Sequence, residues 1–340
     1  MVKIIPGLVF AVIIAILANF ISGLEIVKKT VNFSPLIIAI LLGVFVGNVW
    51  KIPEQLKPGV VFSLKKVLRI AIVFLGFRLT FQNVIDVGLE GLIVDAIMLT
   101  LTFLFGVWIS RRFFGLEPEM SYLIASGSSI CGASAVLATA PVVRAEMHHA
   151  AMAVATVTIF GTTAMFVYPL VYKFAGSSLG FDDILYGIWT GATVHEVAQV
   201  VAAGFAVSDV AGNTATISKL TRVMMLAPLL IALSFYLAKK NAMHGAGIAL
   251  RDIPIPYFVF GFIAMVGVNS THIIPQNIVH YINLIDGFLL TVAMAAMGLE
   301  TNINKIKGVG MKPIYAAFLI FIFLFVVGII SIKVIHALLG

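Results

Sequence analysis

Long apolar stretches alternate with short polar segments along almost the whole chain. Eleven stretches of about 18 apolar residues stand out, and each is long enough to cross a hydrocarbon core about 30 Å thick as a helix. They lie at 5–22, 35–50, 67–84, 89–110, 121–143, 149–172, 182–206, 220–238, 254–270, 279–299 and 312–338. Nothing is left over for a soluble domain. The pattern predicts an all-α membrane protein of about eleven transmembrane helices, with residues 1–340 forming one polytopic domain.

Composition agrees with this fold class. Of the 340 residues, 61% are hydrophobic and 11% are charged, whereas soluble domains carry roughly 25% charged residues. The net charge of +7 could suggest nucleic acid, but the Lys and Arg residues are scattered over short loops and form no basic patch. The only cysteine, Cys131, excludes an intrachain disulfide and a cysteine-cluster metal site.

The cations are distributed unequally between the two predicted sides of the membrane. On the N-terminal side, Lys3, Lys51, Lys57, Lys65, Lys66, Arg69, Arg111, Arg112, Lys173, Lys239, Lys240, Arg251, Lys305, Lys307 and Lys312 make fifteen. The opposite side has the six cations Lys28, Lys29, Arg144, Lys219, Arg222 and Lys333, and Arg78 is left within a span. By the positive-inside rule we expect a multi-pass protein of the cell (inner) membrane with a cytoplasmic N-terminus and an external C-terminus.

Two segments of the chain repeat the same pattern. "RIAIVFLGFRLTFQNVIDVG" (69–88) resembles "LTVAMAAMGLETNINKIKGVG" (290–310), and the likeness extends over segments 36–114 and 256–337. The offset is seven spans. Because an odd offset places the two copies in opposite orientations, the pattern predicts inverted structural repeats, which are typical of secondary transporters.

Two further segments, 119–143 and 182–207, each begin with acidic residues and have a cluster of glycine and hydroxyl residues between two apolar halves. We interpret them as two broken helices. By the span count they lie two spans apart and run parallel, which does not fit a simple inverted pair. Either a span is miscounted between them or the repeat is rearranged.

The first break falls in "SGSSICGAS" (126–134). Unwound backbone at this depth must line a cavity or lie against protein, and the N-terminus of the second half-helix would favour an anion. The candidate substrate-binding residues are Ser128, Ser129, Cys131, Gly132 and Ser134. The alternative is close helix packing through small residues.

The second break falls in "TGATVHEVAQVVAAG" (190–204). On a helix that begins near Thr193, His195, Glu196 and Gln199 would share one side. A carboxylate inside a membrane is costly and normally marks a proton or substrate path. Glu196 and His195 are therefore the candidate ion-coupling residues, and Thr193 and Gln199 are candidate substrate-binding residues. The alternatives are a protonated Glu196 bound to a neighbouring helix and a His195 that acts only as a structural hydrogen-bonding group.

Other polar residues carry weaker signals. Arg78 could meet an anion and is kept as a candidate substrate-binding residue, although arginine near a helix end commonly reaches to the interface. Asp95, Asp286 and Glu300 lie near predicted helix ends and are expected to be interfacial. The sequence "HEVAQ" differs from the HExxH zinc motif by Gln199, a poor zinc ligand, so we expect no metal site and no intramembrane protease. The sequence contains no P-loop motif, which argues against a primary pump.

The stretches "GSSICGASAVLATAPVV" and "WTGATVHEVAQVVAAG", together with "KLTRVMMLAPLL" (219–230) and "LRIAIVFLGFRLT" (68–80), resemble the YeiH family of inner-membrane proteins, commonly labelled sulfate exporters. The resemblance covers nearly the whole chain, and "ICGASA" and "HEVAQV" are its specific parts. By looser similarity the family is placed with the cation:proton antiporter and bile-acid:sodium symporter superfamily. That placement implies inverted repeats and two broken helices that cross near the midplane, with Ser128 to Ser134 at one crossing and Thr193 to Gln199 at the other.

Together these observations lead to the hypothesis of a secondary active transporter, not an enzyme, for a small anion such as sulfate, a related sulfur oxyanion or a sulfonate. We expect no cofactor, with a proton or a sodium ion as the coupling ion. The expected partners are the anion and the lipid bilayer, with no nucleic acid, and a homodimer is considered. An ion channel, or a cation:proton antiporter on the same fold, is the alternative.

Overall fold

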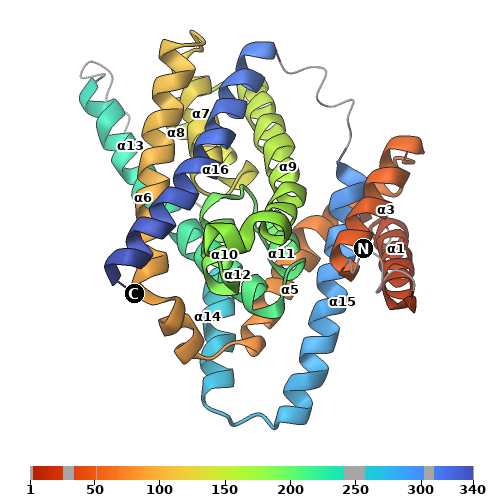
Figure 1. The fold of residues 1–340 in the computed structure, drawn as a ribbon. Coiled ribbons are helices and arrows are strands. Elements are labelled where there is room, and N and C mark those ends of the chain that lie inside the picture. The colour runs from red at the N-terminus through yellow and green to blue at the C-terminus, as the bar shows by residue number, and fades with distance from the viewer. Residues whose placement is uncertain (1–2, 26–33, 51, 241–256, 302–309, 340) are drawn as a thin grey trace. The chain divides into compact units, whose positions relative to one another are not determined.

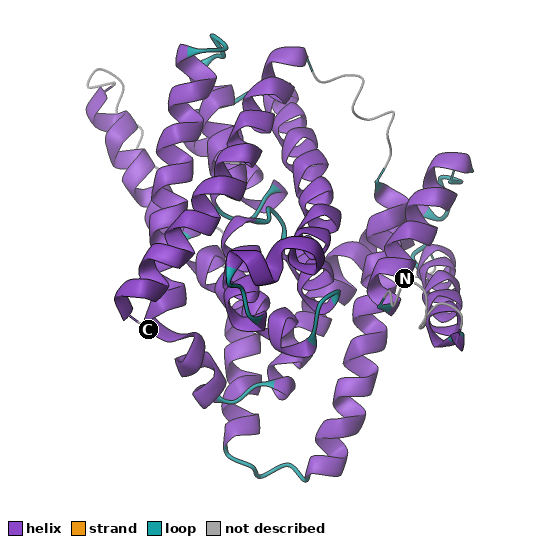
Figure 2. Cartoon of the chain, in the orientation of Figure 1, coloured by secondary structure: helices purple, strands orange, loops and turns teal. Residues whose placement is uncertain are grey.

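The computed structural model describes residues 3–25, 34–50, 52–240, 257–301 and 310–339. Throughout these ranges every regular element is a helix, and short loops connect the helices (Figure 2). The chain forms two compact units. The first unit comprises Met1–Asp86 and Tyr257–Asn304, and the second comprises Val87–Pro256 and Lys305–Gly340. The apolar pattern predicts one transmembrane domain, so this division is an additional feature of the fold.

The first unit contains helices α1 (Ile5–Gly23), α3 (Pro35–Val49), α4 (Lys57–Phe62), α5 (Leu68–Leu75), α14 (Tyr257–Ser270) and α15 (Gln276–Glu300), with a π-helical turn η1 (Ser63–Val67) and a 3-10 turn η2 (Gly76–Arg78). Helix α3 packs on α15, and α14 packs on α5. Glycines permit the closest approach, since a Cβ on Gly43 of α3 would lie 2.5 Å from the carbonyl oxygen of Ala295 in α15. Small residues of this kind let membrane helices pack backbone to backbone.

The predicted span 67–84 is wrong as a single helix. Helix α5 ends at Leu75, η2 follows, and Leu79 is extended before the next helix begins at Phe81. The chain packs closely on α14 here, since a Cβ on Gly76 would lie 2.6 Å from the carbonyl oxygen of Phe262. Side chains of α14 also bind the backbone at the break: the amide of Asn269 donates to the carbonyl of Leu79, and the hydroxyl of Ser270 accepts from the N–H of Phe81.

The second unit holds α6 (Phe81–Arg112, with its first residues in the other unit), α7 (Pro118–Ser129), α8 (Ala133–Val143), α9 (Met147–Leu179), α10 (Asp183–Thr193), α11 (Val197–Phe205), α12 (Asp209–Met224), α13 (Leu226–Lys240) and α16 (Met311–Leu339) (Figure 1). Helix α6 is kinked at Gly88, which has φ 47° and ψ −147°. The predicted start of span 220–238 is wrong, because the apolar helical segment there runs from Asp209 to Leu237 and includes α12. The repeat segment 290–310 includes residues 302–309, which lie outside the described residues.

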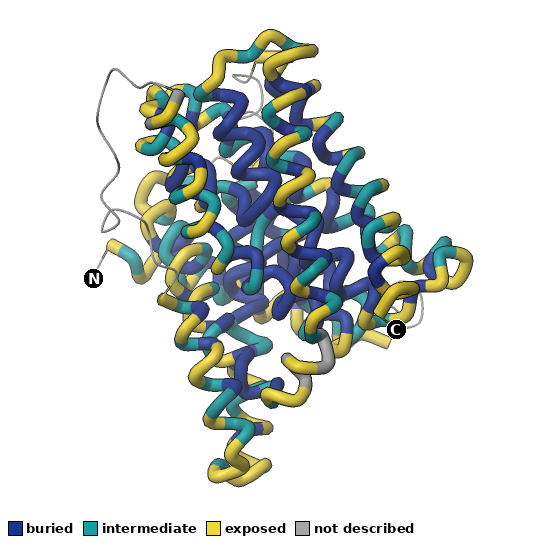
Figure 3. Tube along the Cα trace, turned by 90° about the vertical axis from the view of Figure 1, so that its left-hand side faces the viewer, coloured by how far each residue is buried: buried dark blue, intermediate teal, exposed yellow. Residues whose placement is uncertain are grey.

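Six described helices are long and apolar enough to cross a membrane, and Pro35–Val49, Ala133–Val143 and Tyr257–Ser270 are shorter apolar helices. Buried positions follow the helix faces that are turned toward other helices, and exposed positions follow the outer faces (Figure 3). Many of those exposed positions are large and apolar, Phe45, Leu104 and Phe235 among them. Apolar outer faces over an apolar core are expected when the surrounding solvent is lipid. The prediction of an all-α membrane fold is confirmed.

Both predicted breaks are present, and at each of them the chain folds back on itself. A Cβ on Gly127 of α7 would touch Val136 of α8, and α7 packs along α8. The hydroxyl of Tyr186 in α10 donates to the carbonyl of Ala203 in α11 at 3.1 Å. The half-helices have only 9 to 12 residues, or about 14–18 Å at 1.5 Å per residue. Each pair therefore forms a helical hairpin that is too short to span the bilayer.

This folding back resolves the orientation conflict in the span count. A hairpin returns to the side of the membrane from which it enters, so only α9 crosses between the two hairpins. The hairpins then enter from opposite sides, which is compatible with the predicted inverted pair. The repeat of segments 36–114 and 256–337 stays a prediction. Its last helices, α6 and α16, both lie against the hairpins: a Cβ on Gly106 of α6 would lie 3.0 Å from Cβ of Ala125 in α7, and α16 packs on α7 and α10.

Candidate functional site

The tip of the first hairpin is the three-residue turn Ile130–Gly132. Helix α7 ends at Ser129, and Gly132 takes φ 65° and ψ −130° before α8 begins. This backbone conformation is open almost only to glycine. The break thus falls within the predicted stretch 126–134, and Gly132 is the residue that permits it.

The tip of the second hairpin is the turn Val194–Glu196. The prediction that His195, Glu196 and Gln199 share one helix face is wrong, because α10 ends at Thr193 and α11 begins only at Val197. Glu196 is the N-cap of α11. Its carboxylate accepts from the backbone N–H of Gln199, and the Gln199 side chain accepts from the backbone N–H of Glu196 at 3.0 Å. This reciprocal capping box satisfies two helix-end donors.

Glu196 also lies at the start of the other second-half helix. The backbone N–H of Ala133, the first residue of α8, donates to its carboxylate. A Cβ on Gly132 would lie 2.4 Å from Cγ of Glu196, and the hydroxyl of Thr158 in α9 donates to Oε1 at 3.5 Å. One carboxylate therefore caps two helix N-termini, whose dipoles both favour negative charge.

The backbone carbonyls at the C-terminal ends of the first half-helices, α7 and α10, are bound by two cations that sequence reasoning missed. Lys219 of α12 donates to the carbonyls of Ile130 at 2.5 Å and Val194 at 2.6 Å. Arg222, one turn further on, donates to the carbonyls of Ser129 and Ala192. Each cation thus joins the two hairpins. We refer to Lys219 and Arg222 as the cation pair.

The assignment of Lys219 and Arg222 to an external loop is wrong, since both side chains are fully buried in the second unit. They lie on α12, which runs beside α10: Cβ atoms on Gly187 and Gly191 would meet Thr214 and Ser218. The polar sequence of residues 209–222 concealed this helix from a hydropathy window. The available signal was the spacing of the two cations by three residues, which places them on one helix face.

Asp95 is likewise not interfacial as predicted. It is fully buried in α6, and both of its carboxylate oxygens accept from the hydroxyl of Ser218, at 2.9 and 3.1 Å. Ser218 directly precedes Lys219. The interior of the second unit thus contains two acids and two bases in ordered positions.

The two ends of the breaks differ in exposure. The carbonyl ends, with Ser129, Ile130, Ala192 and Val194, are buried together with the cation pair. At the amide ends, Ala133, Glu196 and Val197 are partly exposed and Ser134 is exposed. The residues at the amide ends, Glu196 among them, are therefore in part accessible to solvent, and the cations are not.

The other predicted residues of these two stretches lie at or beside the tips. Ser128 and His195 are buried, and neither Ser128 Oγ nor His195 Nδ1 has a hydrogen-bond partner. The Ser129 and Thr193 hydroxyls donate to carbonyls of their own helices, at 3.3 Å and 2.5 Å. Cys131 is buried and free. The second unit thus brings together every predicted site residue except Arg78.

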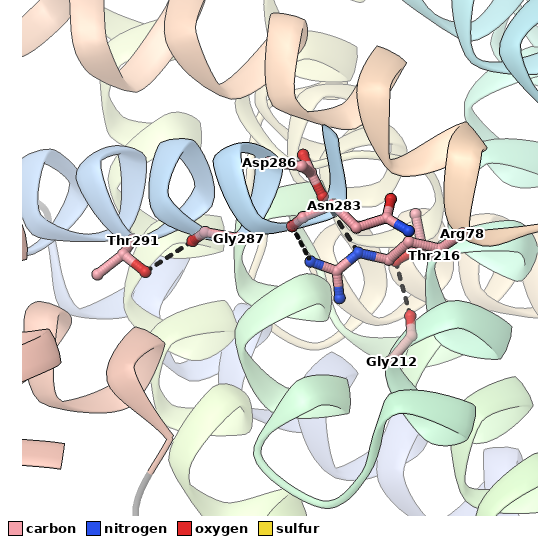
Figure 4. A network of polar contacts seen from close by, with 7 residues as sticks. All are labelled: Arg78, Gly212, Thr216, Asn283, Asp286, Gly287 and Thr291. Carbon is pink, nitrogen blue, oxygen red and sulfur yellow. Dashed lines mark hydrogen bonds and ion pairs between the residues drawn. The ribbon is translucent and has the colours of Figure 1, made fainter. Parts of the chain in front are cut away.

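Arg78 lies in the first unit, where its guanidinium is held by α15 (Figure 4). Its Nε lies 3.2 Å from the carboxylate of Asp286, and Nη2 donates to the carbonyl of Asn283 at 3.3 Å. Asp286 is fully buried, so its predicted interfacial position is wrong. Glu300, by contrast, is the last residue of α15, as its predicted place near a helix end requires. Arg78 thus forms an ion pair within its own unit.

A metal site does not emerge from the described residues, none of which form a group of three or more His, Cys, Asp and Glu side chains suited to an ion. Gln199, which interrupts the HExxH pattern, serves the helix cap instead. Its carbonyl packs so tightly on α9 that a Cβ on Gly161 would lie 2.0 Å from Oε1.

Helices with apolar outer faces, two internal hairpins and a buried set of charges define a multi-pass all-α membrane protein. The family model "Conserved hypothetical protein 698" matches residues 6–317. The "UPF0324 inner membrane protein YeiH" of Escherichia coli K12 is 45% identical over 330 residues, which cover 95% of this chain and 92% of that protein. The chain therefore belongs to the YeiH family.

Other relatives are similar over the same length. The "UPF0324 membrane protein plu2856" of Photorhabdus laumondii is 42% identical over 335 residues, covering 96% of this chain and 92% of the relative. A Yersinia pestis "UPF0324 membrane protein" is 44% identical over 334 residues, with the same coverage. No solved structure matches the chain.

Proposed function

We propose that this protein is an ion-coupled secondary transporter of a small anion that works by alternating access. Membership of a family whose members are named as inner membrane proteins fits a membrane transporter in general. Sulfate, a related sulfur oxyanion or a sulfonate is the proposed substrate, and the second unit is the proposed binding unit.

The observation that carries the proposal is the position of the Glu196 carboxylate. It caps α8 and α11 together and is partly exposed. The two helix N-termini already accommodate a negative group there, so an oxyanion that displaces Glu196 would meet the same backbone donors. Ser134, exposed in the first turn of α8, and Thr158 are hydroxyl donors beside that position.

The balance of charge inside the second unit supports coupling to a cation. In their ordinary charged forms, Lys219 and Arg222 offset Glu196 and Asp95, so the four groups sum to zero. An added anion would leave this interior negatively charged within lipid, which is costly. Protonation of Glu196, or one bound sodium ion, restores neutrality for a monovalent anion such as a sulfonate, and a divalent anion such as sulfate needs two such positive charges. We propose that Glu196 carries the coupling proton, with His195 beside it.

Topology follows from the same proposal. With both hairpins counted as returning to their side of entry, Arg144 joins the N-terminal side and Lys173 moves to the other. The buried Lys219 and Arg222 are removed from the count. Fifteen cations then face four, a stronger bias than the sequence count gives. The residues Lys28, Lys29, Lys51, Arg251, Lys305 and Lys307 in this count lie outside the described residues. We propose a cytoplasmic N-terminus and an external C-terminus.

The test is transport in proteoliposomes that contain the purified protein. Labelled sulfate, sulfite and a small sulfonate are supplied with and without an inward proton gradient and with and without sodium. We expect gradient-driven uptake by the wild-type protein. In Glu196→Gln, we expect uptake to lose its response to the pH gradient, while exchange of internal for external anion continues, because a neutral amide resembles the protonated acid.

Glu119→Gln is the matched control, because Glu119 lies in the first turn of α7, away from the tips. A wild-type protein that moves none of these anions argues against the proposal. Gradient-driven uptake by Glu196→Gln at the wild-type rate would remove the coupling role alone.

A cation:proton antiporter is the second candidate, because a partly exposed carboxylate is also a ligand for a small cation. In that case sodium or potassium would dissipate an imposed proton gradient in the same vesicles without any anion. Single-channel currents in planar bilayers would instead indicate a channel.

A further inference from the structure

We infer that the cation pair on α12 positions the Glu196 site by joining the two hairpin tips into one body, and that Asp95 holds the cation pair in place through Ser218. The inference deepens the proposed function, because it names the residues that keep the proposed binding site assembled. Lys219, Arg222 and Asp95 are positioning residues here, since an anion at the amide ends would touch none of them.

The argument begins with the crossed pattern of hydrogen bonds. Lys219 binds one carbonyl from each tip, those of Ile130 and Val194. Arg222 binds one carbonyl from each hairpin too, those of Ser129 and Ala192. A cation that only neutralised one half-helix would bind carbonyls of that helix alone. Both cations instead link the hairpins to each other.

Electrostatics favours this arrangement. The C-terminal ends of α7 and α10 carry partial negative charge and leave carbonyls without helical partners. All four carbonyls belong to buried residues, where an unsatisfied backbone group is costly. The two cations supply the missing donors and the opposite charge at once, so separating the tips would expose both the carbonyls and the cations to a dry interior.

The bonds to Lys219 also fix the positions of the amide ends, because each tip is only three residues long. Ile130, bound by Lys219, is two residues before Gly132, against which Glu196 packs. Val194, also bound by Lys219, is two residues before Glu196. A shift of either tip away from Lys219 would therefore move Glu196 relative to the start of α8.

Asp95 fixes the cation pair from the other side. Its carboxylate binds the hydroxyl of Ser218, and the two residues lie on α6 and α12. This contact sets the position of α12 along α6 immediately before Lys219. The negative charge of Asp95 also offsets the two cations, which have no carboxylate within ion-pair distance among the described residues.

The single native cysteine supplies a direct assay. Cys131 lies in the first tip, next to Ile130, and is buried. Labelling by a maleimide in detergent therefore reports tip opening and needs no substrate. We expect Arg222→Met to raise the labelling rate by about tenfold or more, because local opening governs the access of the reagent. Arg222→Lys should stay near the wild-type rate, since Lys219 shows that one ammonium can join two carbonyls.

Arg112→Met is the matched control, because it makes the same substitution at an exposed position. It should label at the wild-type rate. Size-exclusion profiles and circular dichroism establish that each variant is folded. If Arg222→Met does not fold, Ser218→Ala leaves both cations in place, removes the donor to Asp95, and should still raise labelling measurably. Wild-type labelling rates in the folded variants would overturn the inference.

Transport adds a readout that loss of stability alone would not give. Positioning predicts that Arg222→Met raises the KM for the anion about tenfold, because the donors at the amide ends are misaligned, and that Arg222→Lys restores it. An unchanged KM with a lower amount of active protein would indicate a purely structural role and contradict the inference. If the wild-type protein carries no anion, the proposed function fails, and the Cys131 labelling still decides whether the cation pair joins the tips.

Discussion

Replacing Gly132 by alanine tests the contact between the two hairpins most directly. The three atoms nearest to a Cβ at this position all belong to Glu196, with Cγ at 2.4 Å, Oε1 at 3.1 Å and Cδ at 3.2 Å. Real Cβ atoms do not approach other atoms to 2.4 Å, so the Glu196 side chain must leave the start of α8. The backbone at φ 65° and ψ −130° is also unfavourable for alanine.

The two costs can be separated because the chain offers a matched glycine. Gly88 has φ 47° and ψ −147°, and a Cβ there would meet nothing within 4 Å. Both substitutions therefore carry a backbone cost of about 1–3 kcal/mol, and only Gly132→Ala displaces Glu196. Loss of a helix cap adds about 0.5–2 kcal/mol. At roughly 2–4 °C per kcal/mol, Gly132→Ala should unfold several degrees below Gly88→Ala.

The assay is thermal unfolding in detergent, followed by tryptophan fluorescence and combined with Glu196→Ala in a double-mutant cycle. In the Glu196→Ala background all three clashing atoms are gone, so Gly132→Ala should cost no more there than Gly88→Ala does in the wild type. Equal melting temperatures for Gly132→Ala and Gly88→Ala, or strict additivity in the cycle, would refute the assignment of Glu196 to both helix N-termini.

Two further experiments test other contacts. Gly161→Ala should push Gln199 out of the capping box and lower the melting temperature by several degrees, because the new Cβ would lie 2.0 Å from Oε1 of Gln199. Gly176→Ala is the control and should have little effect, because its Cβ meets only the Tyr172 ring, at 3.1 Å. Equal shifts of the melting temperature would contradict the role of Gln199. In the first unit, a thermal double-mutant cycle of Arg78→Gln and Asp286→Asn should give a coupling energy of about 0.5–3 kcal/mol. The anion KM of Arg78→Gln should be unchanged, and a raised KM would instead return Arg78 to the binding site.

Sequence periodicity was sufficient for the fold class and for the location of both breaks. The breaks are visible because glycine and polar residues interrupt two apolar runs. These residues are Gly127 and Gly132 with the serines around them, and Thr193 to Glu196. The direction that the second half-helix takes after each break could not be predicted from the sequence in the same way. Whether a half-helix continues or folds back depends on contacts such as Tyr186 with Ala203, and these join residues of two separate apolar runs whose hydropathy is equal in either arrangement.

The candidate site was predicted in its anionic half only. Glu196 stands out because an acid within an apolar run is unusual. Lys219 and Arg222 do not, because the segment 209–222 is polar enough to be taken for a loop, and a window of hydropathy cannot distinguish a loop from a helix buried among polar groups. Asp95 was expected to be interfacial because it lies near the start of a predicted span, and its partner Ser218 lies 123 residues away.

The arrangement of charge suggests which part of the site can move. At the carbonyl ends, both cations and all four acceptors are buried, and breaking any of these bonds would leave a charge in a dry environment. Among the described residues at the amide ends, the charged group is Glu196, which is partly exposed and loses its charge when it takes up a proton. Protonation weakens the attraction of Glu196 to the two helix N-termini and leaves no unpaired charge behind. The cheapest rearrangement is therefore a rotation of one side chain away from Gly132, with both hairpins still joined by the cation pair. Under the proposed transport function, an anion would then take the place of the carboxylate, so that proton uptake and anion binding would be linked at the same pair of helix ends.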